Sequence, residues 1–195
     1  MKTVIVKYNA GNVQSVMYAL DRIGANYTYT DSEEEIRSAD KVIFPGVGEA
    51  STAMSYLREK GLDKLIPSLK QPVLGTCIGM QLMCNFSEEN NTTCMGIFDV
   101  DVLKFKETPG FKIPHMGWNT ISDYKTPLVT NLADHAHVYF VHRDAAPICQ
   151  YTVATCDYIQ PFSAMLQKDK FYAAQFHCEI SGQVGQQILE NFLKI

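Results

Sequence analysis

The segment Gln71-Pro72-Val73-Leu74-Gly75-Thr76-Cys77-Ile78-Gly79 joins an apolar, strand-like stretch to a helix-like one and puts a cysteine at the turn between them. Glycines at 75 and 79 leave room for a sharp turn that lifts one side chain out of the sheet edge and lets a reacting carbonyl approach the backbone. A helix that begins just after the turn points free N–H groups at the sulfur. The segment therefore predicts a strand–turn–helix unit with Cys77 as a candidate nucleophile, against the alternative of a small buried cysteine.

Strand and helix signals alternate around this unit. Strands are predicted at 3–8, 26–30, 41–44, 71–75, 98–105, 138–141, 151–155, 163–166 and 171–176, and helices at 13–23, 51–60 and 184–193. Alternation at this pitch in the first half indicates βαβ units and a mostly parallel sheet. The strands of the second half look antiparallel or mixed. We predict an α/β fold in one compact domain spanning residues 1–195.

Composition limits the possible functions. The 195 residues are 46% hydrophobic and 19% charged with a net charge of −4, and the basic residues are scattered, which argues against a nucleic-acid or anionic-membrane partner. No apolar run is long enough to span a membrane, and the N-terminus resembles a strand instead of a signal peptide, so we expect a cytoplasmic protein. The six cysteines form no C-x-x-C pair and are expected to be reduced thiols. We expect no metal and no cofactor.

Three candidate segments end at the edge of the sheet where ligands bind in such folds, the carboxyl ends of the parallel strands. They are Pro45-Gly46-Val47-Gly48, Gly75-Thr76-Cys77-Ile78-Gly79 and His177-Cys178-Glu179. A cysteine nucleophile needs a base, and the base needs an acceptor that orients it. On an extended segment, His177 and Glu179 would project from the same face and could fill both roles. The alternative is a histidine that merely ends a strand.

Residues 75–81 (Gly-Thr-Cys-Ile-Gly-Met-Gln) and 175–179 (Gln-Phe-His-Cys-Glu) resemble the class I, triad-type glutamine amidotransferases. Residues 114–119 (Pro-His-Met-Gly-Trp-Asn) narrow the resemblance to the glutaminase subunits of imidazole glycerol phosphate synthase. Residues 8–12, 44–48 and 139–142 also resemble that family, so the match covers nearly the whole chain in order. The resemblance implies a three-layer, flavodoxin-like fold.

The resemblance also implies roles for residues around the turn. Cys77 would attack the side-chain amide of glutamine, His177 would act as general base and acid, and Glu179 would orient it. The backbone N–H of Ile78 would supply one half of an oxyanion hole, and the other half would come from the segment made of Gly46, Val47 and Gly48. One peptide group of that segment is expected to change its orientation when a partner subunit binds its own ligand. The substrate would be held by Gln81 and Glu89.

A partner is implied as well. The family docks onto a (β/α)8-barrel cyclase subunit, to which it supplies ammonia for the synthesis of imidazole glycerol phosphate and an aminoimidazole carboxamide ribotide in histidine biosynthesis. The matching partner-facing positions are Asn12, His115, Met116, Trp118, Asn119 and Tyr139. Trp118 suits an interface anchor, although a large aromatic is about as often plain core.

Three departures from the family lie near the site. Cys178 stands where proline is usual, Ile180 where lysine is usual, and Arg143-Asp144 where a small hydroxyl residue and tyrosine are usual. The two charges of Arg143 and Asp144 either pair with each other or attract the substrate carboxylate. They leave open a scaffold subunit with impaired glutaminase activity. A glutaminase of another pathway also fits the catalytic residues, and a cysteine protease on a similar fold fits them less well.

Overall fold

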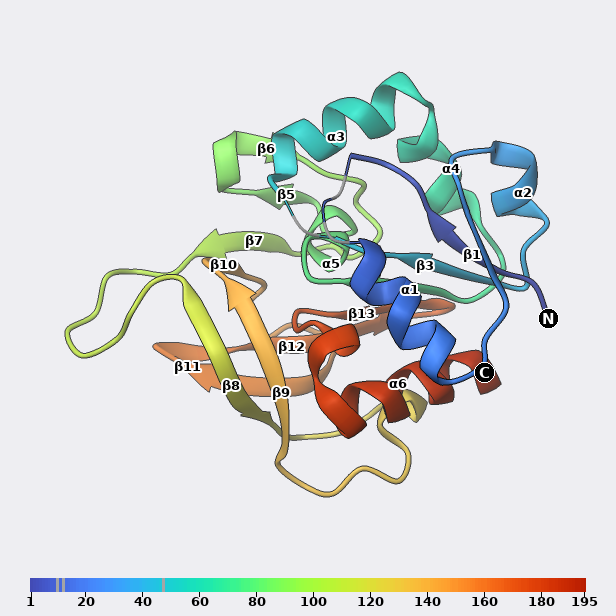
Figure 1. Cartoon of the computed structure of the whole chain (residues 1–195). Coiled ribbons are helices and arrows are strands. Elements are labelled where there is room, and N and C mark those ends of the chain that lie inside the picture. The colour runs from blue at the N-terminus through green and yellow to red at the C-terminus, as the bar shows by residue number, and fades with distance from the viewer. Residues whose placement is uncertain (10, 12, 47) are drawn as a thin grey trace.

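A seven-stranded sheet runs through the middle of the molecule in the computed structural model, which describes residues 1–9, 11, 13–46 and 48–195 (Figure 1). Its strand order is β11-β12-β13-β4-β3-β1-β2. Five neighbouring strands are parallel: β2 (Tyr27–Thr30), β1 (Thr3–Val6), β3 (Lys41–Phe44), β4 (Val73–Thr76) and β13 (Phe171–Ala174). The antiparallel strands β12 (Gln160–Lys168) and β11 (Thr152–Tyr158) complete one edge. The predicted mostly parallel sheet with later antiparallel strands is confirmed.

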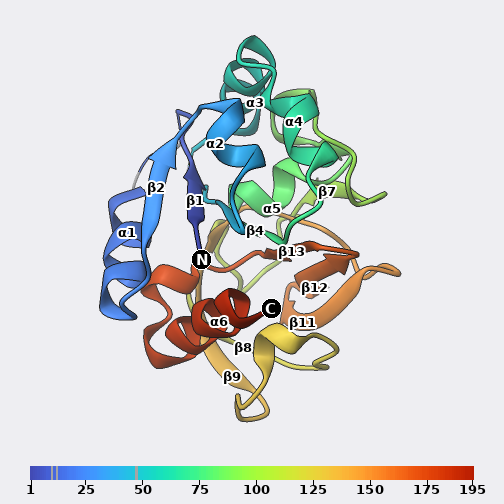
Figure 2. The same cartoon turned by 90° about the vertical axis from the view of Figure 1, so that its right-hand side faces the viewer.

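Helices cover both faces of this sheet and make three layers (Figure 2). On one face lie α1 (Val13–Arg22) and α6 (Gly182–Lys194), and on the other α2 (Glu33–Arg37), α3 (Ala50–Glu59), α4 (Leu62–Ser68) and α5 (Ile78–Leu82). Alternate residues of one strand supply the two cores, because successive side chains point to opposite faces. Val42 packs with the α3 side, for example, and Ile43 with the α1 and α6 side.

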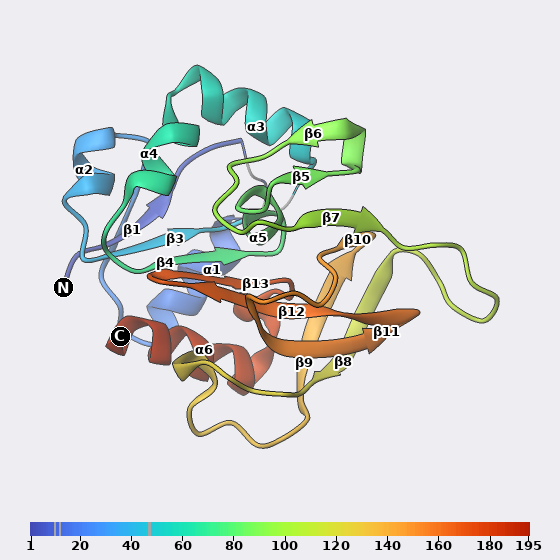
Figure 3. The same ribbon diagram turned by 180° about the vertical axis from the view of Figure 1, so that it is seen from behind.

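Two smaller sheets lie at the end of the large sheet where β3 and β4 finish (Figure 3). One contains β5 (Phe86–Ser87), β6 (Thr92–Thr93), β7 (Asp101–Lys104) and β10 (Asp144–Ala145). The other is the antiparallel pair of β8 (His115–Ile121) and β9 (Ala136–His142). The short 3-10 turns η1 (Glu89–Asn91), η2 (Pro127–Val129) and η3 (Cys178–Ile180) complete the described elements.

The sequence-based predictions differ from the structure in several elements. The strand expected over 98–105 is confined to β7, and the structure contains elements that we did not predict: helix α4, strand β8 and the short strands β5, β6 and β10. Helix α4 follows Gly61, whose left-handed φ of 70° separates it from α3, and it contains Pro67. A helix of this length with a proline has little periodicity to signal it.

The three candidate segments leave neighbouring strands at one level of the sheet. In the β13-β4-β3 register, Ala174 is opposite Thr76 and Phe44 is opposite Gly75, so the chain emerges from all three strands at the same edge. Residues after these positions therefore face one another across the carboxyl ends of the strands. In the described part of the chain, no helix has the length and apolar character needed to cross a membrane.

Candidate active site

Cys77 occupies the sharp turn between β4 and α5. Its backbone has φ 51° and ψ −112°, a conformation that residues with a side chain rarely adopt. Glycines make the turn possible, because a Cβ on Gly79 would lie 2.2 Å from the carbonyl oxygen of Phe44, and one on Gly75 would lie 3.0 Å from that of Gly79. A 2.8 Å hydrogen bond from the Cys77 N–H to the carbonyl of Ala174 ties the turn to β13. The predicted strand–turn–helix unit is present and rigidly supported.

His177 and Glu179 form a buried hydrogen-bonded pair beside this turn. His177 Nδ1 lies 2.7 Å from Glu179 Oε1, and the side chains of both residues are 5% exposed. The backbone of His177 is fixed from two sides: its N–H donates to the Tyr139 carbonyl, and its carbonyl accepts from the Ser181 hydroxyl. The prediction of an extended 177–179 segment is wrong, because residues 178–180 form the turn η3. The turn itself brings the carboxylate to the imidazole.

The environment raises the pKa of His177 to about 10. Burial of the ring acts to lower this pKa, but hydrogen bonds with Cys77 and Glu179, together with the negative charge on both groups, more than offset it. His177 therefore holds a proton at neutral pH. An imidazolium next to Cys77 stabilises negative charge on the sulfur and has a proton to give to a leaving group.

The segment after β3 packs directly against the Cys77 turn. A Cβ on Gly46 would lie 2.0 Å from Ile78 Cγ2 and 2.4 Å from the Gly79 nitrogen, so this approach requires glycine. Gly48 has φ 128° with open space around a Cβ, and it lines the same pocket as Ile78. Ile78 is the first residue of α5, where N–H groups have no acceptor within the helix. Val47, part of the predicted oxyanion segment, lies outside the described residues.

A pocket of about 200 Å³ opens above Cys77. It is smaller than the roughly 300–1,000 Å³ sites of drug-sized ligands, and suits a small polar molecule. Among its lining residues are Gly48, Cys77, Ile78, Gln81, Glu89, Val141, His142, Arg143, Asp144 and His177. The structure thus brings all four predicted substrate residues to the same pocket as the cysteine and the histidine.

Charged groups at this pocket are joined by Arg143. Its Nη2 lies 2.9 Å from Glu89 Oε1, and its Nε lies 3.0 Å from Asp144 Oδ2. The other Glu89 oxygen accepts the Ala50 N–H at 2.8 Å. Asp144 is buried, and its Oδ1 has no hydrogen-bond partner among the described residues. Arg143 therefore pairs with Asp144, one of the two expected arrangements, and also with Glu89, which the sequence did not reveal.

Gln81 is buried beneath these charges and is already engaged within the protein. Its Nε2 donates to the Asp144 carbonyl at 2.9 Å and to Gln175 Oε1 at 3.1 Å. Both amide hydrogens are thereby used. Gln81 fixes the backbone of Asp144 and leaves only its amide oxygen for a ligand.

Two neutral histidines, His142 and His115, form a hydrogen-bonded row that leads from the pocket toward the surface of the hairpin. The sequence analysis gave no role to His142, which lines the pocket. His142 Nδ1 lies 2.9 Å from the Asp144 carbonyl, and its Nε2 lies 2.9 Å from His115 Nδ1. His115 Nε2 in turn lies 3.4 Å from Asn119 Nδ2. Burial lowers the pKa of His142 to about 3 and that of His115 to about 4. Because the Asp144 carbonyl can only accept and the Asn119 amide nitrogen can only donate, every hydrogen bond in this row is donated in one direction, from Asn119 toward Asp144.

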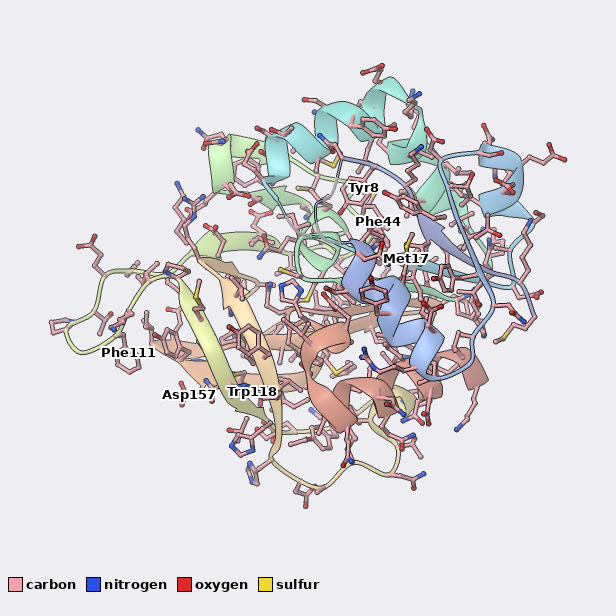
Figure 4. The ribbon with its side chains drawn as sticks, in the orientation of Figure 1. Tyr8, Met17, Phe44, Phe111, Trp118 and Asp157 are labelled. Carbon is pink, nitrogen blue, oxygen red and sulfur yellow. The ribbon has the colours of Figure 1, made fainter. Side chains whose placement is uncertain are left out.

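The predicted partner-facing residues separate into two groups. Met116 and Trp118 are 62% and 56% exposed on β8, and Figure 4 labels Trp118 on this strand. Trp118 packs edge-on against Tyr139 with ring centroids 5.7 Å apart. His115, however, is buried, with its ring stacked on Tyr158 inside the hairpin, and its partner-facing role stays a prediction. Asn119 is half-buried, and Asn12 lies outside the described residues.

Comparison with known proteins agrees with this geometry. Residues 4–195 match the family model described as glutamine amidotransferase class-I. The chain belongs to that family. It is 54% identical, over the full length of both chains, to "Imidazole glycerol phosphate synthase subunit HisH" of Bacteroides fragilis (strain YCH46). It is 41% identical to the protein of the same name from Shewanella loihica, with 99% of this chain and 90% of the relative covered.

These relatives confirm the predicted resemblance: the chain is a class-I glutamine amidotransferase of the imidazole glycerol phosphate synthase subunit family. A crystal structure of a glutamine amidotransferase superposes with a TM-score of 0.76 at 18% identity, covering 98% of this chain and 97% of that one. At that identity the superposition shows the fold alone. The class-I amidotransferase fold predicted from the sequence is therefore confirmed.

Proposed function

We propose that this amidotransferase hydrolyses glutamine with a Cys77–His177–Glu179 triad and passes the ammonia to a (β/α)8-barrel cyclase subunit. The observation that carries the proposal is the pairing of His177 with Glu179 at 2.7 Å beside a cysteine in a strained turn, with both Cys77 and His177 lining one small pocket. A buried cysteine without chemistry needs no such turn, base and orienting carboxylate.

The first half-reaction makes a thioester. The Cys77 sulfur attacks the side-chain carbonyl carbon of glutamine, and the oxygen becomes an oxyanion that the Ile78 N–H and the Gly46–Gly48 segment stabilise. His177 donates its proton to the amide nitrogen, the C–N bond breaks, and ammonia leaves. A preorganised donor of this kind is worth on the order of a hundredfold or more in rate.

The second half-reaction restores the enzyme. Neutral His177 now takes a proton from water, the resulting hydroxide attacks the thioester carbonyl, and the C–S bond breaks. Glutamate leaves, and Cys77 and His177 return to their starting state with one water consumed. Glu179 stabilises the imidazolium that alternates with the neutral ring and keeps Nδ1 toward itself.

The charged groups around the pocket suit the zwitterionic end of glutamine. Glu89 offers a carboxylate for the α-ammonium, and Gln81 offers its remaining amide oxygen. Arg143 uses only two of its five N–H donors on Glu89 and Asp144. Its other donors are available to the α-carboxylate without loss of either ion pair, which supports substrate recognition by Arg143 with Asp144 as its anchor.

We place the docking surface for the cyclase on the hairpin, with Met116 and Trp118 on its exposed face, the half-buried Tyr139 beside Trp118, and the half-buried Asn119 on the His115 side. The term "subunit" in the names of the relatives supports an assembly with another chain. Delivery of ammonia within that assembly would yield imidazole glycerol phosphate and aminoimidazole carboxamide ribotide in histidine biosynthesis. A single domain over residues 1–195 is supported by two hydrophobic clusters that share one sheet.

A scaffold subunit with impaired glutaminase activity is the second candidate. It is favoured by the Arg143–Glu89 ion pair, because this pair engages the carboxylate that would otherwise bind the α-ammonium of glutamine. One experiment separates the two. The purified chain is mixed with a histidine-pathway cyclase and its ribotide ligand, and glutamate release from glutamine is followed for the wild type and Cys77→Ala. Ligand-stimulated release that disappears in the variant supports the triad enzyme. A complex that forms without glutamate release supports the scaffold, and hydrolysis without a complex points to another pathway.

A further inference from the structure

Tyr8 lies beneath the segment that follows β3. It comes two residues after β1, is 4% exposed, and packs its ring on Phe44 with centroids 5.0 Å apart (Figure 4). Its hydroxyl donates a hydrogen bond to the carbonyl oxygen of Pro45. The contact joins the ends of two adjacent parallel strands at the carboxyl edge, directly beside the reacting centre.

This hydrogen bond fixes the direction of a backbone N–H. The Pro45 carbonyl and the Gly46 N–H belong to one planar peptide unit, in which the two groups point in opposite directions. A hydroxyl that holds the carbonyl on the Tyr8 side therefore turns the Gly46 N–H away from Tyr8. Gly46 is confined on its other side by Ile78 and Gly79, which leave no room even for a methyl group.

The two ends of the glycine segment are held differently. At Gly46 the peptide is held between the Tyr8 hydroxyl and the Cys77 turn, whereas Gly48 has φ 128° and nothing within 4 Å of a Cβ. The backbone is therefore closely confined at Gly46, whereas Gly48 has open space beside its Cα. A tether of this kind would keep one end of the segment in register with the nucleophile during any rearrangement of the other.

The Tyr8 hydroxyl is suited to permanent donation. Burial, followed by electrostatic repulsion that the ionised forms of Cys77 and Tyr29 would exert, raises the pKa of Tyr8 well above its ordinary value. The phenol therefore stays protonated throughout the working pH range. The influence of Cys77 also reflects how close the phenol lies to the catalytic centre.

We propose that Tyr8 is a positioning residue for the oxyanion hole, acting through the Pro45–Gly46 peptide. The inference rests on the proposed glutaminase function. Tyr8 does not touch the substrate; it holds the first peptide of the segment whose N–H groups receive the developing negative charge. Loss of the hydroxyl should therefore weaken stabilisation of the tetrahedral intermediate and leave the thiol and the glutamine pocket intact.

The test compares the wild type with Tyr8→Phe, which keeps the ring and its packing on Phe44. Tyr56→Phe is the matched control, because the Tyr56 hydroxyl donates to Asp31 and neither residue lines the pocket. Glutamine hydrolysis is measured in the complex with the cyclase. Alkylation of Cys77 is followed by peptide mass spectrometry with two reagents: iodoacetamide, which substitutes without forming an oxyanion, and a chloromethyl ketone analogue of glutamine, which forms one.

We expect Tyr8→Phe to lower kcat by about tenfold to a hundredfold, somewhat less than removal of an oxyanion donor itself, with KM within about twofold. Alkylation by the chloromethyl ketone should slow in parallel, whereas alkylation by iodoacetamide should keep its wild-type rate. Tyr56→Phe should match the wild type in every assay. A structural or thiol-activating role would slow both reagents alike.

Two results would overturn the inference alone: an active wild type with an unchanged Tyr8→Phe, or equal slowing of both alkylations. A wild type that reacts with iodoacetamide but neither hydrolyses glutamine nor captures the chloromethyl ketone would overturn the proposed function, and this inference with it.

Discussion

Arg143 should determine the affinity for the α-carboxylate of glutamine. The perturbation is Arg143→Ala, which removes the guanidinium from the pocket and frees Glu89 and Asp144. The Arg143 side chain is 46% exposed, but Asp144 is 5% exposed, so the variant leaves a buried carboxylate without its cation and should lose about 1–3 kcal/mol of folding free energy. Thermal denaturation of the variant is therefore measured first, so that its effect on substrate binding is read from folded protein.

The magnitude follows from the hydrogen bonds that a carboxylate would form with the unused N–H groups. Each hydrogen bond to a charged group contributes about 1.5–3 kcal/mol, which corresponds to roughly a tenfold to hundredfold rise in KM for glutamine. The kcat value should change only a few-fold, because Arg143 does not reach the scissile amide in the proposed reaction. Arg143→Lys should recover part of the affinity, since an ammonium keeps the charge but loses the fork of donors.

The assay compares two substrates, glutamine and its α-amide, which lacks the carboxylate. Arg143→Ala should raise KM for glutamine and leave KM for the α-amide within about threefold. Arg37→Ala removes another exposed arginine that pairs with a glutamate, Glu33, far from the pocket, and should change neither value. Equal loss with both substrates, or tighter binding of glutamine by Arg143→Ala, would refute the reasoning and favour an ion pair that obstructs the site.

Further predictions concern the turn, the triad and the imidazole pair. Gly79→Ala places a Cβ 2.2 Å from a backbone carbonyl oxygen and should lower the free energy of unfolding by about 1–3 kcal/mol in denaturant titrations. Glu179→Gln removes a negative charge that helps to hold the pKa of His177 at about 10 and leaves only a neutral acceptor for its Nδ1–H, so the alkaline decline of kcat/KM should move to lower pH by about one unit or more; an unmoved profile contradicts the assignment. His115 and His142 stay neutral in the fold down to about pH 4 and 3, whereas in the unfolded chain both take up protons near pH 6.5. The contribution of these two histidines to stability should therefore be complete above pH 6.5 and fall by up to about 1.4 kcal/mol per pH unit per histidine below it, and His115→Gln should remove about half of that slope.

The sequence was sufficient where chemistry is local. The glycines around Cys77 and the strand before it predicted the nucleophile turn, because the strand, both glycines and the residue with φ 51° lie within nine positions of one another. The parallel sheet followed from alternating periodicities in the same way. His177 and Glu179 were paired correctly, although by a 3-10 turn and not by an extended strand.

Long-range arrangements were not predictable from one chain. Arg143 and Glu89 are 54 positions apart, and only the packing of β10 beside the pocket brings them together. The burial of His115 also depends on tertiary packing. Met116 and Trp118 on the same strand are exposed, and nothing in the local motif indicates that the histidine turns inward to stack on Tyr158. Tertiary context decided these side chains, and local pattern could not.

The most direct test of the account is to trap the acyl-enzyme. The complex with the cyclase and its ribotide ligand is mixed with glutamine and quenched in acid within the first turnover, and the peptide containing Cys77 is examined by mass spectrometry. The account predicts one γ-glutamyl group in thioester linkage on Cys77, absent from Cys77→Ala and discharged to glutamate on longer incubation. Release of glutamate with no acyl group on Cys77, or with undiminished rate in Cys77→Ala, would contradict it.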